Sequence, residues 1–154
     1  MHMPRLLLCL VILLGAGPAL GLDGAARAID GGTLDVAGTT VRLAGIEAPD
    51  LAQTCVVPEG RWSCGILARD ALADLVRGHP VTCTDAGTVP WAASISRCNV
   101  RGRDLGTVLV QFGWAAATGP DPGYVALEKK ARAARAGIWR GDLDVPWGYV
   151  APLR

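Results

Sequence analysis

The sequence predicts an α+β fold built from five β-strands and three α-helices. Apolar residues alternate with polar or small ones along five short segments, near residues 25–30, 33–37, 40–46, 80–84 and 94–100. This is the period of a strand with one buried face. A helical segment at about 65–77 separates the third strand from the fourth, and two more helices are expected near 104–113 and 122–136.

The second and third strands are predicted as a hairpin. Ala37-Gly38-Thr39 supplies the turn between two alternating apolar runs, made by Leu34 and Val36 on one side and by Val41, Leu43 and Ile46 on the other. Arg42 then points away from the apolar face of the third strand. Glu47 and Asp50 flank Ala48-Pro49 just beyond its end.

Capping residues set the expected bounds of the later helices. Asp104 is a predicted N-cap for the second helix, because a short carboxylate accepts hydrogen bonds from the first free N–H groups. Gly113 is expected to end that helix, and Gly137 the third, since glycine readily adopts the left-handed conformation found there.

The first 21 residues predict a signal peptide, with cleavage near Gly21. Arg5 precedes the unbroken apolar run Leu6 to Leu14, and the small residues Ala19 and Gly21 follow it. An uncleaved N-terminal anchor is the alternative, although the run is short for a membrane span. We therefore expect an exported protein, periplasmic or secreted, with residues 22–154 as one domain, no stable membrane span and a monomeric state.

The charge balance excludes a broadly basic nucleic-acid binder. The chain has 15 Lys and Arg residues against 14 Asp and Glu residues, whereas non-specific binding to phosphate backbones depends on a basic face. Any such face must be local. The candidates are Arg97, Arg101 and Arg103, or a helical group that is more simply a solvated outer surface, Lys129, Lys130, Arg132 and Arg135.

Four cysteines remain once Cys9, in the signal peptide, is set aside. An even number in an exported chain favours two disulfides. The favoured pairing is Cys55–Cys64, across a polar loop, and Cys83–Cys98, between neighbouring strands. A zinc site made of four thiolates is the alternative, but the short Cys-x-x-Cys units typical of one are missing.

Several motifs occur in a fixed order along nearly all of the chain after residue 26. They are Asp30-Gly31-Gly32-Thr33, Arg42-Leu43-Ala44-Gly45-Ile46-Glu47-Ala48-Pro49-Asp50, Cys55, Trp62-Ser63-Cys64-Gly65, Arg69-Asp70-Ala71-Leu72, Gly102-Arg103-Asp104-Leu105, Phe112-Gly113-Trp114-Ala115 and Gly137-Ile138-Trp139. In this order the chain resembles the thermonuclease family, the staphylococcal-nuclease-like domain. The resemblance implies an OB-fold, a small five-stranded Greek-key barrel.

The resemblance also implies calcium-dependent hydrolysis of DNA or RNA. Such chemistry needs a cation held by carboxylates, a carboxylate that activates water, and two guanidinium groups that neutralise the charge developing on the phosphate. Carried over residue by residue, the catalytic positions are Arg42 and Asp50, and the metal positions are Glu47 and the backbone carbonyl of Ala48.

Several of these positions differ from the family pattern. Gly32 stands at an expected acidic metal ligand, Glu47 is one methylene longer than the usual aspartate, and Asp50 is one shorter than the usual glutamate. The family's second arginine falls on Ala93. Arg97 lies on the same face but four residues further on, about 13 Å along a strand, so it is no simple substitute.

The retained residues also have structural explanations. Arg42 could serve only in a surface ion pair with Glu47 or Asp50, and Asp30 is expected to cap its turn rather than to bind a metal. His79, before Pro80, is expected to be a turn residue.

The sequence therefore predicts a thermonuclease-like pseudoenzyme, in which bound Ca²⁺ is weak or absent. The expected ligand is single-stranded nucleic acid, another anion or a protein partner. The alternative is an active Ca²⁺-dependent nuclease that cuts DNA or RNA.

Overall fold

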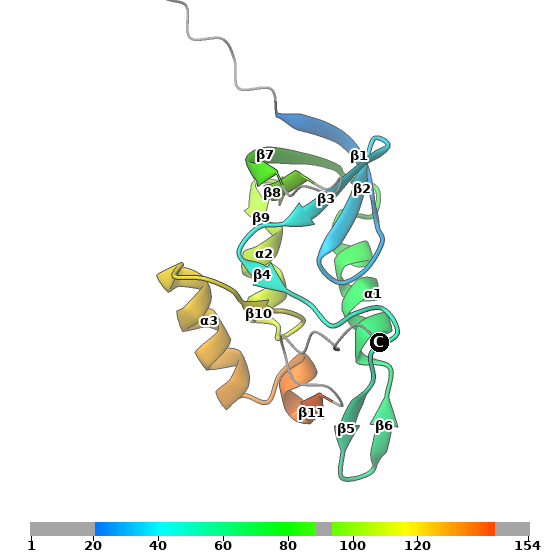
Figure 1. The fold of residues 1–154 in the computed structure, drawn as a ribbon, viewed down its shortest axis with the longest axis vertical. Helices are drawn as coiled ribbons and strands as arrows, with labels where there is room; N and C mark the ends of the chain where they lie inside the picture. The colour runs from blue at the N-terminus through cyan, green and yellow to red at the C-terminus, as the bar shows by residue number, and fades with distance from the viewer. Residues whose placement is uncertain (1–20, 89–93, 144–154) are drawn as a thin grey trace, which may run out of the picture.

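The computed structural model describes residues 21–88 and 94–143, and it has the predicted OB-fold-like α+β architecture (Figure 1). Five strands form a closed barrel in the order β3-β2-β1-β7-β8. They are β1 (Leu22–Ala28), β2 (Thr33–Val36), β3 (Thr39–Leu43), β7 (Pro80–Thr88) and β8 (Ser94–Val100). The first and last strands of this order, β3 and β8, pair in parallel and close the barrel. Residues 1–20 of the predicted signal peptide and Ala93 lie outside the described residues.

The β2–β3 hairpin follows the predicted alternation. Leu34 pairs with Val41 in the antiparallel register, and both side chains are fully buried. Ala37 and Gly38 form the turn with φ values of 49° and 86°, as a tight hairpin requires. Arg42, on the other face of β3, is exposed as predicted.

Six short strands complete the sheets. β4 (Ile46–Glu47) pairs with β10 (Ala116–Ala117). β9 (Arg103–Asp104) extends the barrel sheet beside β8. A separate sheet is formed by β5 (Cys55–Val57), β6 (Gly60–Trp62) and β11 (Asp142–Leu143). The expectation of a polar loop between Cys55 and Cys64 is therefore wrong. Pro58 and Glu59 make the tip of a hairpin in which Cys55 pairs with Trp62.

Three α-helices pack around the barrel, as predicted. α1 (Cys64–Val76) buries Ala68, Leu72 and Val76, and α2 (Leu105–Gln111) is buried along most of its length. The third, α3 (Pro122–Ala133), precedes a 3₁₀ turn, η1 (Gly137–Arg140). None of the described helices is long and apolar enough to cross a membrane.

The helix ends agree with the expected caps in two of three cases. The Asp104 carboxylate accepts a hydrogen bond from the N–H of Thr107 at 2.6 Å, and Gly113 follows α2 with a φ of 73°. Gly137, in contrast, does not end α3. That helix stops at Ala133, the chain reverses at Arg135 with a φ of 50°, and Gly137 opens η1.

Both predicted disulfides are present. Cys55–Cys64 joins the β5–β6 hairpin to the first residue of α1, and Cys83–Cys98 joins two residues directly opposite each other on β7 and β8. All four cysteines are buried. The zinc alternative is excluded because these thiols are consumed in covalent bonds.

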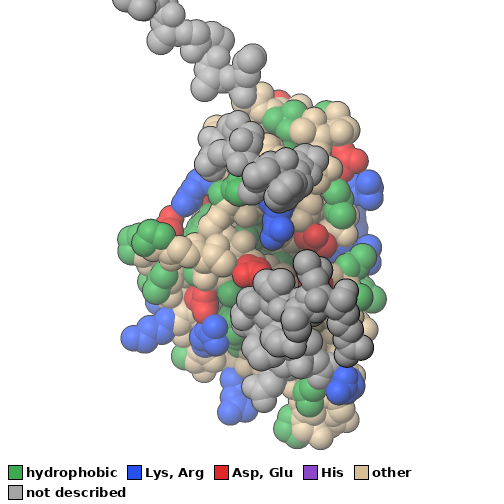
Figure 2. Space-filling model, viewed as in Figure 1, with side chains coloured by type: hydrophobic (Ala, Val, Ile, Leu, Met, Phe, Trp, Pro, Cys, Tyr) green, Lys and Arg blue, Asp and Glu red, His purple; other side chains and the backbone are tan. Residues whose placement is uncertain are grey.

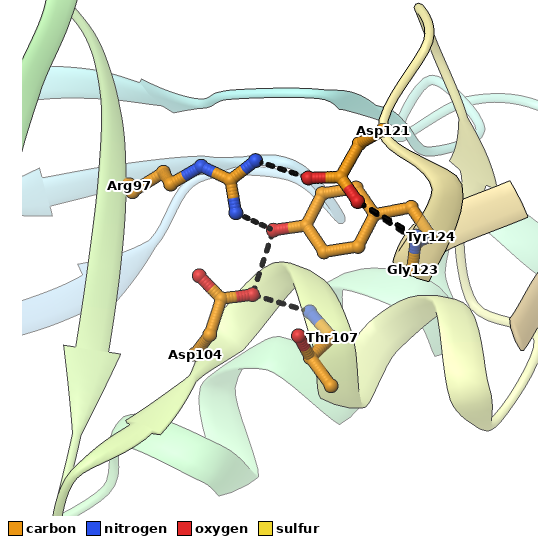
Figure 3. Close-up of polar contacts among 6 residues, drawn as sticks. All are labelled: Arg97, Asp104, Thr107, Asp121, Gly123 and Tyr124. Atoms are coloured by element: carbon orange, nitrogen blue, oxygen red, sulfur yellow. Dashed lines mark hydrogen bonds and ion pairs between the residues drawn. The ribbon is translucent and has the colours of Figure 1, made fainter.

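A polar cluster attaches α3 to the barrel (Figure 3). Arg97 on β8 donates to Asp121, the N-cap of α3, at 2.5 Å, and to the hydroxyl of Tyr124 at 3.4 Å. That hydroxyl donates in turn to Asp104 at 2.7 Å. The cluster thus joins β8, the start of α2 and the start of α3.

The Tyr124 side chain fits into a slot left by two glycines. A Cβ atom at Gly106 would lie 2.5 Å from the Tyr124 oxygen, and one at Gly45 would lie 3.0 Å from its ring. Burial raises the pKa of Tyr124 strongly, and the hydrogen bond to Asp104 raises it further. The hydrogen bond from Arg97 lowers the pKa of Asp121. Tyr124 is therefore stabilised in its neutral form and Asp121 in its charged form.

Removal of the Cys83–Cys98 bond in the double variant Cys83→Ala/Cys98→Ala should lower the free energy of unfolding by about 2–4 kcal/mol, because the open loop gains entropy in the unfolded chain. Urea denaturation of the purified protein measures this change. The matched control is Thr82→Ala/Asn99→Ala, the next pair along the same strands, for which we expect a loss of less than about 1 kcal/mol. Equal losses in the two variants would contradict a stabilising role of the bond.

The variant Tyr124→Phe should lose about 1–2 kcal/mol of unfolding free energy at neutral pH, because it keeps the ring but lacks the hydrogen bond to the Asp104 carboxylate. The native protein should also lose stability as pH rises above about 10, the ordinary tyrosine pKa. Above that pH the unfolded chain releases the phenolic proton while the folded chain still holds it. Urea denaturation from pH 7 to pH 11 should show a smaller alkaline loss in Tyr124→Phe, and identical pH profiles would contradict the assignment.

Candidate functional site

The turn between β1 and β2 carries the residues Asp30, Gly31 and Gly32. One carboxylate oxygen of Asp30, Oδ1, accepts a hydrogen bond from the N–H of Gly32 at 2.8 Å. The backbone N–H of Ile29 donates to the carbonyl of Thr33 across the same turn. The prediction that Asp30 caps its turn is confirmed.

This turn packs directly against the segment that follows β4. A Cβ atom at Gly31 would lie 2.7 Å from the Cβ of Ala48 and 2.8 Å from that of Ala68, so only glycine fits between the segment and α1. At Gly32 the same atom would lie 3.7 Å from the Ala48 Cβ, an ordinary contact distance. The structure therefore brings together the two segments that the resemblance assigns to a metal, with Gly32 beside Ala48.

Arg42 lies on β3 between Thr33 of β2 and Ile95 of β8. Its side chain is exposed, and within the described part of the chain it forms no hydrogen bond or ion pair. A closed ion pair with Glu47 or Asp50 is thus not what the structure contains. Figure 2 shows basic and acidic side chains together at the centre of this face, in the region of β3, β4 and the β1–β2 turn.

Glu47 and Asp50 both follow β3 in the chain but differ in solvent exposure. Glu47 is half-buried on β4, opposite Ala116 of β10. Asp50 is exposed in the following loop, where its N–H donates to the side chain of Gln53. The loop is held against α1, because a Cβ atom at Gly65 would lie 1.8 Å from the Asp50 carbonyl oxygen.

The β1–β2 turn carries a single carboxylate, that of Asp30. Ca²⁺ takes about six to eight oxygen ligands, drawn from carboxylates, backbone or amide carbonyls and water. Gly32 offers no side-chain oxygen, and the Asp30 Oδ1 atom already accepts a backbone N–H. Across residues 21–88 and 94–143, no three His, Cys, Asp or Glu side chains gather as a metal-binding group.

Arg97 lies on β8 two residues after Ile95, the register partner of Arg42. Its guanidinium is held by Asp121 and lies 5.0 Å from the centre of the Tyr124 ring. The hydrogen bond that Arg97 donates to Asp121 is also the main cause of the raised pKa of Arg97. Arg97 therefore helps to attach α3 to the barrel. Because Asp121 balances its charge, Arg97 does not contribute to the basic face that the sequence suggested for Arg97, Arg101 and Arg103.

Arg101 and Arg103 lie at the far end of β8 from Arg42. Arg42 is in register with Ile95, and Arg101 follows six residues later in the turn to β9, about 20 Å along the strand. His79 is near this end too, in the turn after α1, where its N–H donates to the carbonyl of Val76. The prediction of a turn role for His79 is confirmed.

The helical basic group is a solvated surface, as the sequence indicates. Lys129 and Lys130 are exposed. Arg132 pairs with Glu128 at 2.6 Å, and its guanidinium stacks over Trp139 at 3.6 Å. These contacts hold α3 to η1.

The sequence motifs gave no indication of two contacts in this region. One is the attachment of Arg97 to Asp121, residues 24 positions apart. The other is the close approach of the β1–β2 turn to Ala48 and Ala68. The Asp121-Pro122 pair, a typical helix start, was the only sequence signal for the first of them.

The chain matches no family model. It is similar to the succinoglycan biosynthesis protein ExoI of Rhizobium meliloti (strain 1021), with 32% identity over 132 residues. The similar region covers 82% of this chain and 69% of that protein. Identity at this level over this share of both chains shows common descent. The chain therefore belongs to the same family as the succinoglycan biosynthesis protein ExoI.

Proposed function

We propose that this protein is an exported thermonuclease-like domain that binds an anionic ligand at Arg42 without cleaving phosphodiester bonds. The proposal rests on the close packing of Gly32 beside Ala48. The turn and the loop that would share a metal lie in contact, but Gly32 brings no carboxylate to that contact, and the Oδ1 atom of nearby Asp30 accepts the Gly32 N–H.

The setting of Arg42 supports a binding role. Its guanidinium is exposed and has no carboxylate partner in the described regions. A guanidinium presents several N–H donors in a planar fork that matches two phosphate oxygens. OB-folds commonly bind extended polymers on this kind of barrel surface.

The combined changes argue against efficient hydrolysis. Loss of one preorganised charge donor typically lowers a rate by about a hundredfold to a thousandfold, and Ala93 stands at the position of the second arginine. Gly32 removes a metal ligand, while Glu47 and Asp50 shift their carboxylates by one methylene each. Such changes act on one transition state, so their effects are not independent.

A polysaccharide is the second candidate ligand. It is favoured by the relative, which is named as a succinoglycan biosynthesis protein. An exported location is also part of the proposal, supported by the two disulfides, since such bonds persist mainly in oxidising compartments.

Arg42→Gln should weaken binding of a labelled single-stranded oligonucleotide and reduce the slope of log affinity against log salt by about 0.7, the loss of one phosphate contact. Fluorescence anisotropy at about 50 and 200 mM salt measures both quantities. The matched control is Arg77→Gln, which removes the same charge from an exposed arginine already paired with Asp74 and should leave the slope unchanged.

Native protein that does not bind the oligonucleotide, or Arg42→Gln that binds as tightly as native protein, would contradict a nucleic-acid ligand. Unlabelled succinoglycan in the same titration distinguishes the second candidate. Displacement of the oligonucleotide by this polymer would favour a polysaccharide that uses the same arginine.

Mature protein with excess calcium should degrade single-stranded DNA at least about a hundredfold more slowly than a thermonuclease with the full set of catalytic residues. The double variant Gly32→Asp/Ala93→Arg should gain activity, because a side chain at Gly32 meets only ordinary contacts. Gel-based cleavage assays with and without a chelator measure the rates.

The double variant Gly32→Asn/Ala93→Arg is the control, since asparagine has the size of aspartate but lacks its charge. Rapid, chelator-sensitive cleavage by the native protein that disappears in Arg42→Ala would overturn the non-catalytic proposal and establish the nuclease alternative.

A further inference from the structure

A hollow with basic side chains lies between the end of α1, the β8–β9 turn and α2. It has a volume of about 440 Å³ and is lined by His79, Arg101 and Arg103, with an apolar side formed by Leu75, Val100 and Val108. This volume is in the range of small-molecule sites, which combine an apolar lining with a few polar groups.

The two arginines of the hollow carry charges that the described residues do not neutralise. Five other arginines, namely Arg27, Arg69, Arg77, Arg97 and Arg132, each lie within 3.3 Å of a carboxylate oxygen. Arg101 and Arg103 have no such partner in residues 21–88 and 94–143. Asp74 also lines the hollow, but its carboxylate is held by Arg77 at 2.5 Å.

The backbone at Arg101 is in a conformation that arginine seldom adopts. Val100 pairs with Arg103 across the turn, and the two turn residues, Arg101 and Gly102, have φ values of 51° and 73°. Such turns prefer Asn-Gly because asparagine tolerates positive φ better than other side chains do. Arginine at this position is locally unfavourable, and backbone strain of this kind is concentrated at functional sites.

We propose that this hollow binds a small organic phosphate, with the phosphate group between Arg101 and Arg103 and the organic part against Leu75, Val100 and Val108. Guanidinium groups recognise phosphate through paired N–H donors. The half-buried side chain of Leu75 favours a phosphate ester over free phosphate, because it provides apolar surface for the organic group. The site is independent of Arg42, from which it is separated by most of the length of β8.

The test uses a nucleoside 5′-monophosphate as the probe, with the parent nucleoside and inorganic phosphate as comparison ligands, in isothermal titration calorimetry. We expect the monophosphate to bind more tightly than inorganic phosphate and the nucleoside not to bind. Arg101→Asn should weaken monophosphate binding at least tenfold. Because asparagine fits the turn better, the same variant should keep or raise the thermal unfolding midpoint, so that lost binding is not confused with misfolding.

Two controls make the result specific. Arg135→Asn removes the same charge at another arginine with positive φ, 50°, and should leave binding unchanged. Arg101→Asn should also keep the oligonucleotide affinity and the salt slope of the native protein, which separates this site from the function proposed above. The inference is overturned if Arg101→Asn binds the monophosphate like native protein, if inorganic phosphate binds as tightly as the ester, or if the monophosphate fails to bind at concentrations up to about 10 mM.

Discussion

The parallel pairing of β3 with β8 is the constraint on which the rest of the structure depends. Without it, β3 and the first half of β8 would be sheet edges with unpaired backbone groups, because β9 pairs only with the end of β8. With it, Val41, Arg42 and Leu43 are fixed opposite Ser94, Ile95 and Ser96. The closed barrel then holds the β1–β2 turn and the loop after β4 against α1, and it sets the orientation of Arg42 toward solvent.

Local sequence patterns predicted the main elements because their causes are local. The alternation of Leu34, Val36, Val41 and Leu43 reflects a two-residue period, and the carboxylate of Asp104 caps α2 three residues away. The β5–β6 hairpin was missed because its strands are only three residues long. Its polar tip also looks like an ordinary loop, and its partner β11 comes from the opposite end of the chain.

The candidate site was predictable in its positions but not in its contacts. The sequence placed Arg42 on a strand, as observed. It predicted one strand over 40–46 with Glu47 beyond its end, whereas the structure has a break after Leu43 and places Glu47 on the separate strand β4. No pattern in the sequence showed that the Arg42 guanidinium would have no carboxylate partner among the described residues, or that Arg97 would be engaged by Asp121. Both outcomes depend on which distant carboxylates the fold brings close, and those distances are set by tertiary packing.

The glycines of this protein differ in how freely they could change during evolution. Gly113 and Gly137 lie back to back, and a Cβ atom on either would lie 2.3 Å from a backbone oxygen, that of Ala136 or of Gly113. Every replacement of glycine adds a Cβ, so a mutation at either position forces two backbone segments apart. Gly32 has no such restriction. Its lack of a carboxylate is therefore not imposed by packing, and a single codon change could restore that group in a lineage where selection favoured it.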